Sequence, residues 1–159
     1  MSINGPYRKL FGRFKFIVRI QNFASFGFQT CSGLKVSIGE MTYREGGALA
    51  AYKEPALVEF EDLTLGRGIG VDEDMWDWVL EVVDVMAKLP GGIGLPSPDF
   101  MRDLTVDQMD RDDSVAYMYH YFWCWPKDYE SSEWDNNAEE VSVETMIVAY
   151  HHPDKEVVA

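Results

Sequence analysis

The chain has 159 residues, 47% of them hydrophobic and 14% aromatic, which predicts one folded domain over residues 1–159 and excludes an intrinsically disordered chain. Its formal net charge of −13 repels nucleic acid at long range, so a protein that binds DNA through its overall charge is excluded. No apolar run approaches the roughly 20 residues of a membrane-spanning helix, so no membrane association is expected.

The first third of the chain alternates between apolar and polar residues, as strands with one buried face do. Residues 13–21, "RFKFIVRIQ", predict a first strand, and a second strand is expected within "NFASFGFQTCSG", ending at Ser32 and Gly33. The stretch "LKVSIGEMTYRE" predicts a third strand, in which Gly39 interrupts the alternation. A glycine at such a break indicates a β-bulge.

A long connection follows the third strand. Gly46 and Gly47 indicate a turn, because glycine readily adopts the positive φ that turns need. The residues after them, "ALAAYKEPALVEF", are weakly patterned, and Pro55 argues against a central strand because proline cannot donate a ladder hydrogen bond. The stretch "EDLTLGRGI" then alternates again and predicts a further strand.

One helix is predicted, beginning at Asp72. Acidic residues such as Asp72 and Asp74 are favoured at a helix N-terminus. Trp76 and Trp78 near this start are expected to face the core or an interface. The apolar positions that follow helical spacing are Met75, Val79, Val82, Val83, Met86 and Leu89, and the run Pro90-Gly91-Gly92 is expected to end the helix.

The last third is read as three strands and a polar loop. "MRDLTVDQMDRDD" predicts a strand with a turn around Asp110 to Ser114, and the aromatic run "SVAYMYHYFWCWP" predicts a strand with both faces covered. "KDYESSEWDNNAEE" is expected to be a loop, "VSVETMIVAYHH" the last strand, and the tail from Pro153 frayed. Six to eight strands and one helix predict a mainly β (α+β) antiparallel sandwich or partly closed barrel.

The sequence carries no pattern that indicates catalysis. It has no phosphate-binding glycine loop, no CxxC pair and no EF-hand spacing. Cys31 and Cys124 are expected to be reduced thiols in or near the core, and His120 a packed histidine. We therefore expect no cofactor, no metal site and no enzymatic activity.

The charge is unevenly distributed along the chain. No acidic residue precedes Glu40, whereas six basic residues do: Arg8, Lys9, Arg13, Lys15, Arg19 and Lys35. Two interpretations stay open. The basic segment either pairs with acidic neighbours in its own subunit or attracts the acidic body of another copy head to tail.

Several short motifs, taken in order, resemble the tail-tube proteins of contractile phage tails and related injection machines. They are "YREGG", a loop with "KEP", "LTLGRGI" and the helix start "DEDMWDW", followed near the end by "FWCWP", an asparagine-alanine loop and "EVSVET". The opening "FKFIVRIQNFASFGFQTCSGLKV" fits the first two strands of that family. The resemblance runs from about Phe14 to His151.

This resemblance implies a hexameric ring that stacks into a tube, with four strands of each subunit joined into one large inner β-barrel. It implies that an arm reaches onto neighbouring subunits, formed by Tyr43, Arg44, Glu45, Gly46, Gly47, Tyr52, Lys53 and Pro55. The helix start and outer packing would use Asp72, Asp74, Trp76 and Trp78. Possible ring-contact charges are Arg13, Lys15 and Arg19.

The implied function is a structural subunit of a tube that conducts DNA or protein cargo without specific binding. The implied partners are sheath, baseplate and tape-measure proteins, and the implied location is a virion tail or a cytoplasmically assembled injection particle. Two alternatives stay open: a baseplate tube initiator of the same fold, present as one ring, and a monomeric ligand-binding β-barrel whose aromatic strand lines a pocket.

Overall fold

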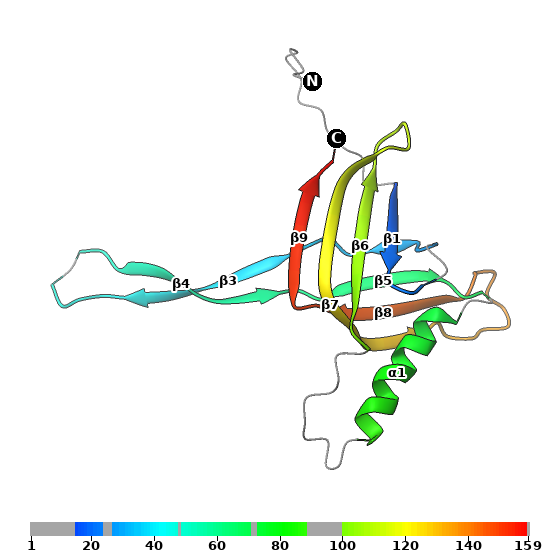
Figure 1. Cartoon of the computed structure of the whole chain (residues 1–159). Coiled ribbons are helices and arrows are strands. Elements are labelled where there is room, and N and C mark those ends of the chain that lie inside the picture. Colours follow the sequence, from blue (N-terminus) through cyan, green and yellow to red (C-terminus); the bar gives the residue numbers. More distant parts are fainter. Residues whose placement is uncertain (1–14, 24–26, 48, 71–72, 89–99, 159) are drawn as a thin grey trace.

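The computed structural model describes residues 15–23, 27–47, 49–70, 73–88 and 100–158. Within these ranges the chain forms nine strands and one helix; Figure 1 shows how they are arranged. They are β1 (Phe16–Ile20), β2 (Thr30–Cys31), β3 (Val36–Tyr43), β4 (Tyr52–Phe60), β5 (Leu63–Gly68), α1 (Asp74–Lys88), β6 (Arg102–Met109), β7 (Val115–Ser131), β8 (Val143–Ala149) and β9 (His152–Val157). Arg13, Asp72 and the predicted helix stop at 90–92 lie outside the described residues.

Strand β7 organises the main sheet because it is long enough to belong to two halves of it. Its first half pairs with β6 on one side and β9 on the other, and β6 pairs in turn with β1. Its second half pairs with β8, which leads to β5 and β2. All these pairings are antiparallel. The two halves run in different directions in Figure 1, and in the single chain they do not close into a barrel.

The core lies where the two halves and α1 meet. Strands of the main sheet turn alternate residues into this core. In β1 the buried residues are Val18 and Ile20, which confirms the predicted alternation. Trp78 of α1 packs edge-on against Phe23, with ring centroids 5.6 Å apart. The other large, fully buried side chains of the described residues are Leu63, Leu65, Met75, Leu104, Met146, Val148 and Cys124.

A β-bulge in β7 changes which side chains point inward. Arg102 of β6 lies opposite Cys124, but Leu104 lies opposite Tyr121, so β7 carries one extra residue there. Trp123 takes a φ of 57°, a left-handed backbone conformation that is uncommon for a large side chain. Tyr121 and Cys124 are consequently both buried, whereas simple alternation predicted opposite faces for them.

Several predicted boundaries are wrong. In the described part of the expected second strand, β2 comprises only Thr30 and Cys31, and the amides of Gln29 and Ser32 on either side of it also donate to β5. Residues 127–131, expected in a polar loop, extend β7 and pair with β8. The tail, expected to be frayed from Pro153, forms β9 on the edge of β7. Backbone pairing to a neighbouring strand overrides the polar composition in both places.

The helix begins at Asp74, with Asp74 and Asp77 in its first turn. Trp78 is fully buried and its indole N–H donates a hydrogen bond of 2.7 Å to the carbonyl of Phe100. Val83 and Met86, predicted on the core side, are exposed instead. In the described part of the chain α1 contacts mainly β7, so its outer apolar positions have no cover.

Candidate assembly surfaces

The four strands β1, β6, β7 and β9 present one face that points away from the core. The register places Ile17 beside Asp107, Asp107 beside Met118, and Met118 beside Glu156. Because side chains alternate along each strand, residues that lie side by side in the register point to the same face, and this identifies the members of the face. Within the strand bounds its charged residues are one cation, Arg19, and four anions, Asp103, Asp107, Asp154 and Glu156, so its net charge is negative. We refer to these five residues as the acidic face. Lys15, which precedes β1 on the same side, is paired with Asp113.

The two described basic residues of the first strand segment each pair with a carboxylate of their own chain. Arg19 contacts Asp107 at 2.6 Å, and Asp107 is almost fully buried. Lys15 contacts Asp113 at 2.6 Å in the turn after β6. The interpretation in which basic charge pairs with acidic neighbours in the same subunit is therefore confirmed for these two residues, whereas Arg13 lies outside the described residues.

Both lateral edges of this four-stranded half are open among the described strands. β1 pairs only with β6, and β9 only with β7. The amide of Val158 donates a hydrogen bond to the carbonyl of Ala116 in β7. Successive amides of a strand point to opposite sides, so the amide of Val157 points away from β7 and faces the free edge. A free edge offers a row of backbone donors and acceptors to another chain.

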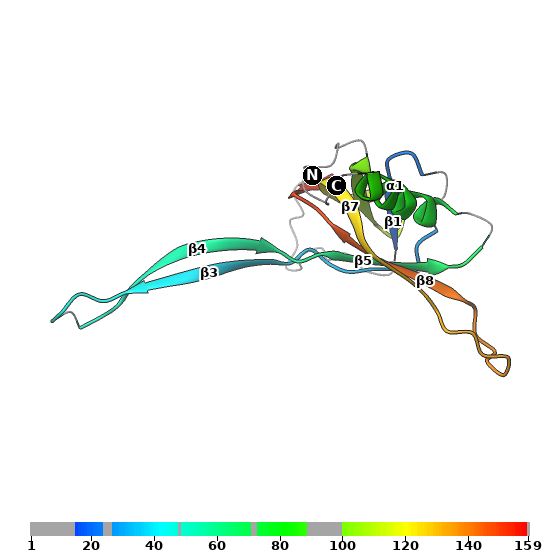
Figure 2. The ribbon, with the colours of Figure 1, turned by 90° about the horizontal axis from the view of Figure 1, so that it is seen from below.

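Residues 36–60 form a two-stranded hairpin, β3–β4, which we name the arm. It projects from the body of the molecule (Figures 1 and 2). The prediction that residues after Gly47 form a weakly patterned connection is wrong for 52–60, which are strand β4. Pro55 is accommodated because a two-stranded ribbon leaves outer edges that need no donor. A register shift between Ile38 and Glu40 confirms the predicted irregularity at Gly39, but the extra residue lies on β4, because Ile38 is opposite Val58 and Glu40 is opposite Pro55.

The arm brings together the residues predicted for it. Tyr43 lies opposite Tyr52, and Thr42 opposite Lys53, while Arg44, Glu45, Gly46 and Gly47 lie in the turn region after β3. Every residue of β3 is exposed. The large apolar side chains of both arm strands are open to solvent, with Tyr43 of β3 at 64% and Tyr52 of β4 at 63% exposure. A ribbon of this kind is not stabilised by a core of its own.

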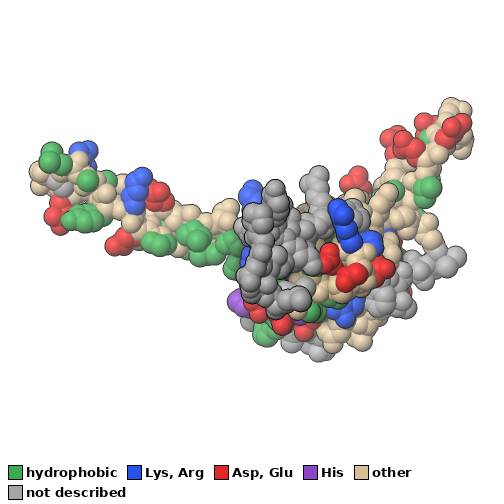
Figure 3. All heavy atoms as spheres, turned by 90° about the horizontal axis from the view of Figure 1, so that it is seen from above, with side chains coloured by type: hydrophobic (Ala, Val, Ile, Leu, Met, Phe, Trp, Pro, Cys, Tyr) green, Lys and Arg blue, Asp and Glu red, His purple; other side chains and the backbone are tan. Residues whose placement is uncertain are grey.

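A second hairpin, formed by β7, β8 and the loop 132–142, projects on the side opposite the arm (Figure 3). Acidic side chains gather over it in this view. Trp134 is 84% exposed in this loop. Near the base of this hairpin the ring of Trp76, at the helix start, packs on the ring of Tyr129, with ring centroids 5.4 Å apart. Trp76 is nevertheless 45% exposed to solvent.

A buried polar cluster links β5, β7 and β8. Arg67 donates to Glu144 Oε1 at 2.6 Å, and the Tyr129 hydroxyl donates to Glu144 Oε2 at 2.6 Å. Burial, then the hydrogen bond to Glu144 and its negative charge, raise the pKa of Tyr129 to about 12, although Arg67 opposes this. The cluster keeps a buried carboxylate paired, which is the condition for its stability.

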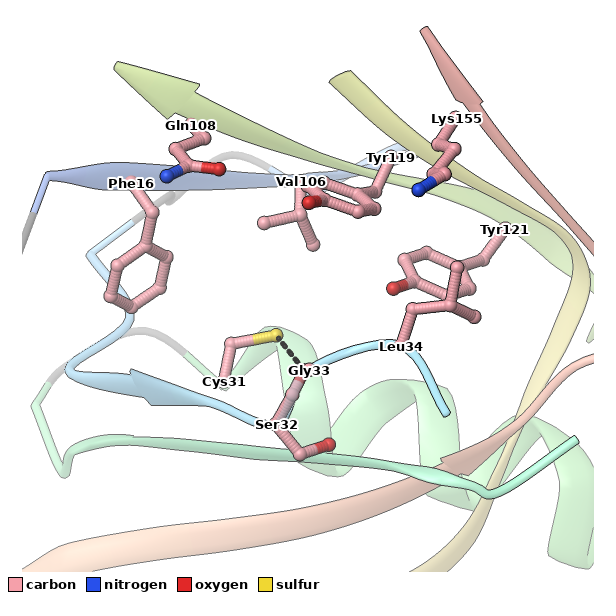
Figure 4. Close-up of a pocket in the computed structure, with 10 residues that line it drawn as sticks. All are labelled: Phe16, Cys31, Ser32, Gly33, Leu34, Val106, Gln108, Tyr119, Tyr121 and Lys155. Carbon is pink, nitrogen blue, oxygen red and sulfur yellow. Dashed lines mark hydrogen bonds between the residues drawn. The ribbon is translucent and has the colours of Figure 1, made fainter. Parts of the chain in front are cut away.

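A groove of about 510 Å³ opens between the two halves of the sheet. In Figure 4 the rings of Phe16, Tyr119 and Tyr121 and the amine of Lys155 turn toward the same space, with Cys31 and Leu34 opposite. Burial raises the pKa of Cys31 to about 11 and that of Cys124 to about 12, so both free thiols stay protonated.

Among the described residues there is no group of three or more His, Cys, Asp or Glu side chains that could hold a metal ion. Within the same ranges no helix is long and apolar enough to cross a membrane.

Three site residues were missed by sequence reasoning. Asp107 and Asp113 pair with the basic strand, and Trp123 marks the bulge in β7. The alternation of β6 indicates that Asp107 lies on the face opposite the core. Its ion pair with Arg19 can be found only from the register between β1 and β6. No sequence signal marks a positive φ at a tryptophan.

Comparisons with known proteins agree on one group. The sequence matches the T4-like virus tail tube protein gp19 family over residues 12–153. No curated protein sequence matches the chain. Among solved structures, a chain of the anti-feeding prophage cap, which terminates its tube, has a TM-score of 0.77 at 16% identity, covering 99% of this chain and 100% of that chain.

Two further solved structures are similar. A chain of the sheath–tube complex of PVC, an extracellular contractile injection system, has a TM-score of 0.75 at 16% identity and covers 94% of this chain and 93% of that chain. A chain of the anti-feeding prophage baseplate has a TM-score of 0.75 at 14% identity and covers 95% and 98%. These likenesses establish a shared fold.

Proposed function

Because this chain belongs to the T4-like virus tail tube protein family and is a structural tube subunit, we propose that six copies form a ring and that rings stack into a conduit for DNA or protein cargo. The observation that carries this proposal is a four-stranded sheet whose two lateral edges, β1 and β9, are free among the described strands. Such a sheet can join its own copies.

The strand directions favour head-to-tail joining. Four antiparallel strands leave β1 and β9 running in opposite directions. Pairing the β9 edge of one copy with the β1 edge of the next therefore continues the antiparallel alternation. A head-to-tail contact closes into a ring when its rotation allows, and a closed barrel leaves no strand edge exposed.

The acidic face would line the channel of this ring. Its Arg19 is paired with Asp107, so the only cation among its five charged residues offers no free charge to a phosphate. A wall that binds phosphates gains affinity by releasing counterions, and this affinity must be lost again before DNA moves. A mildly repulsive wall keeps the cargo mobile, and this role requires neither specific binding nor catalysis.

The arm would provide contacts to neighbouring copies, since its apolar side chains are exposed on the single chain. Sheath, baseplate and tape-measure proteins are the proposed further partners, and the proposed setting is a phage tail or a contractile injection particle. The residues proposed for the helix start and outer packing are Asp74, Trp76 and Trp78, of which Trp76 is half exposed and Trp78, being fully buried, contributes only packing.

The edge pairing can be tested by Val157→Pro. The amide of Val157 faces the free edge of β9, so proline removes an outward donor without removing a bond to β7. We expect a folded subunit that no longer forms rings by electron microscopy, while Val158→Ala, next to it and with its amide bond kept, still does. Rings of Val157→Pro as abundant as those of the unaltered protein would contradict the proposal.

The second candidate is a tube initiator in a baseplate, because one similar structure is a baseplate component. The number of stacked rings that the purified protein forms distinguishes a tube subunit from a baseplate initiator. A tube subunit grows into stacks of many rings, whereas an initiator stops at a single ring.

A further inference from the structure

The outer part of the arm carries an apolar patch with an acidic rim. Tyr43 lies opposite Tyr52, and Met41 opposite Glu54, so these side chains share one face of the ribbon. With Glu45 they line one shallow hollow. Met41, Tyr43 and Tyr52 are between 55% and 64% exposed. We name Met41, Tyr43, Tyr52 and Glu54 the distal patch.

The groove between the two halves of the sheet has the complementary character. It is lined by aromatic and aliphatic side chains, among them Phe16, Leu34 and Tyr119, and it carries one cation, Lys155. Lys155 is exposed and forms no ion pair with any residue that the structure describes, and its amine lies 5.7 Å from the ring centroid of Tyr117. Glu54 of the distal patch likewise has no ion-pair partner in the described ranges.

The two surfaces cannot meet within one chain as it is built, because the arm extends away from the body that holds the groove (Figures 1 and 2). The occupant of the groove that fits both its apolar lining and its cation is therefore the arm of a second copy. Tyrosine is well suited to such a contact, since it buries a large ring and keeps a polar tip.

We propose that the distal patch of one copy lies across the mouth of the groove of another copy, with Glu54 paired to Lys155. This inference rests on the proposed function, because it names the surface on which the arm docks during assembly. The apolar contact supplies most of the stabilisation, and the Glu54–Lys155 pair selects the correct groove, since like charges placed together at an interface are strongly disfavoured.

Charge reversal tests the pairing directly. Glu54→Lys and Lys155→Glu are each expected to raise the protein concentration needed for assembly by at least about tenfold. Glu59→Lys, on the same arm but nearer its base, and Lys127→Glu, which breaks an ion pair with Asp62 away from the groove, are the controls and should assemble as the unaltered protein does. Far-UV circular dichroism shows that each variant is folded.

Mixing the two variants tests whether the arm of one copy pairs with the groove of another. A Glu54→Lys copy has a basic arm and a basic groove, and a Lys155→Glu copy has an acidic arm and an acidic groove. A one-to-one mixture should therefore restore assembly with the two kinds of copy alternating, and the double variant should assemble alone.

Three outcomes overturn the inference while leaving the proposed function intact: normal assembly of either single variant, failure of both the mixture and the double variant, or equal defects in the controls. If the unaltered protein forms no rings at all, the proposed function fails first, and the inference with it.

Discussion

Arg19 of β1 and Asp107 of β6 form an ion pair of 2.6 Å in which the carboxylate is buried and the guanidinium is about half exposed, at 6% and 47% side-chain exposure. The pair joins an edge strand to the next strand on the face that we propose lines the channel. The pair thus neutralises the charge of Arg19 on this face and also links the edge strand β1 to β6. A buried carboxylate without a partner is costly.

Removing the arginine should therefore destabilise the subunit. We expect Arg19→Gln to lower the free energy of unfolding by about 1–2 kcal/mol, less than for a fully buried pair because Arg19 is half exposed. Urea unfolding at a concentration below assembly measures this. Lys15→Gln, which breaks the exposed pair with Asp113, is the control and should cost less than about 0.5 kcal/mol. Equal losses for both variants would show that burial of Asp107 does not matter.

The Tyr129 hydroxyl predicts a dependence of stability on alkaline pH. Its pKa is raised from an ordinary value of 10.0 to about 12 in the folded chain. A raised folded-state pKa contributes stability that is complete below pH 10 and is lost as the pH rises toward 12. Tyr129→Phe should therefore lose less stability between pH 9 and about 11.5 than the unaltered chain. An identical decline in the urea midpoint of both proteins would contradict this.

The two tryptophans at the helix start should respond very differently to the same change. Trp78→Phe removes a buried indole and leaves the carbonyl of Phe100 without its donor, so we expect a loss of about 2–3 kcal/mol. Trp76 is 45% exposed, and Trp76→Phe should change stability by less than about 0.5 kcal/mol. Thermal unfolding measures both, and a larger effect at Trp76 would refute this assignment of core and surface.

Shortening the arm should separate folding from assembly. Ser37 lies opposite Glu59, and the backbone bond from the Glu61 amide to the Lys35 carbonyl makes this the next hydrogen-bonded pair. Replacing residues 38–58 by Asn-Gly therefore closes the ribbon with a two-residue turn. The core is untouched, and we expect the free energy of unfolding to stay within about 1 kcal/mol while ring and tube formation stops. Unfolding of the shortened chain would mean that the arm packs on its own core, and normal tubes would mean that the outer arm is not a contact surface.

Sequence reasoning predicted elements well where one periodicity dominated. The alternation at Val18 and Ile20, the break at Gly39 and the acidic start of α1 each have a local physical cause, and the structure bears them out. The family resemblance, carried by short motifs in order, is likewise confirmed by the match over residues 12–153.

The failures arise where partners distant in sequence decide the structure. β9 and the second half of β7 are polar, and they are strands because β7 offers them a ladder. β4 reads as irregular because its side chains have no core to face. Burial of Cys124 beside Tyr121 depends on one extra residue at Trp123. The pairing of Arg19 with Asp107 depends on register, which alternation alone does not set.

We propose that copies of this chain join through the edges of the four-stranded sheet into rings. The decisive experiment is electron microscopy of the purified, unaltered protein over a range of concentrations, together with its mass in solution. We expect six-membered rings that stack into tubes as the concentration rises. A protein that stays monomeric at the highest concentration, with no rings on the grid, would contradict it.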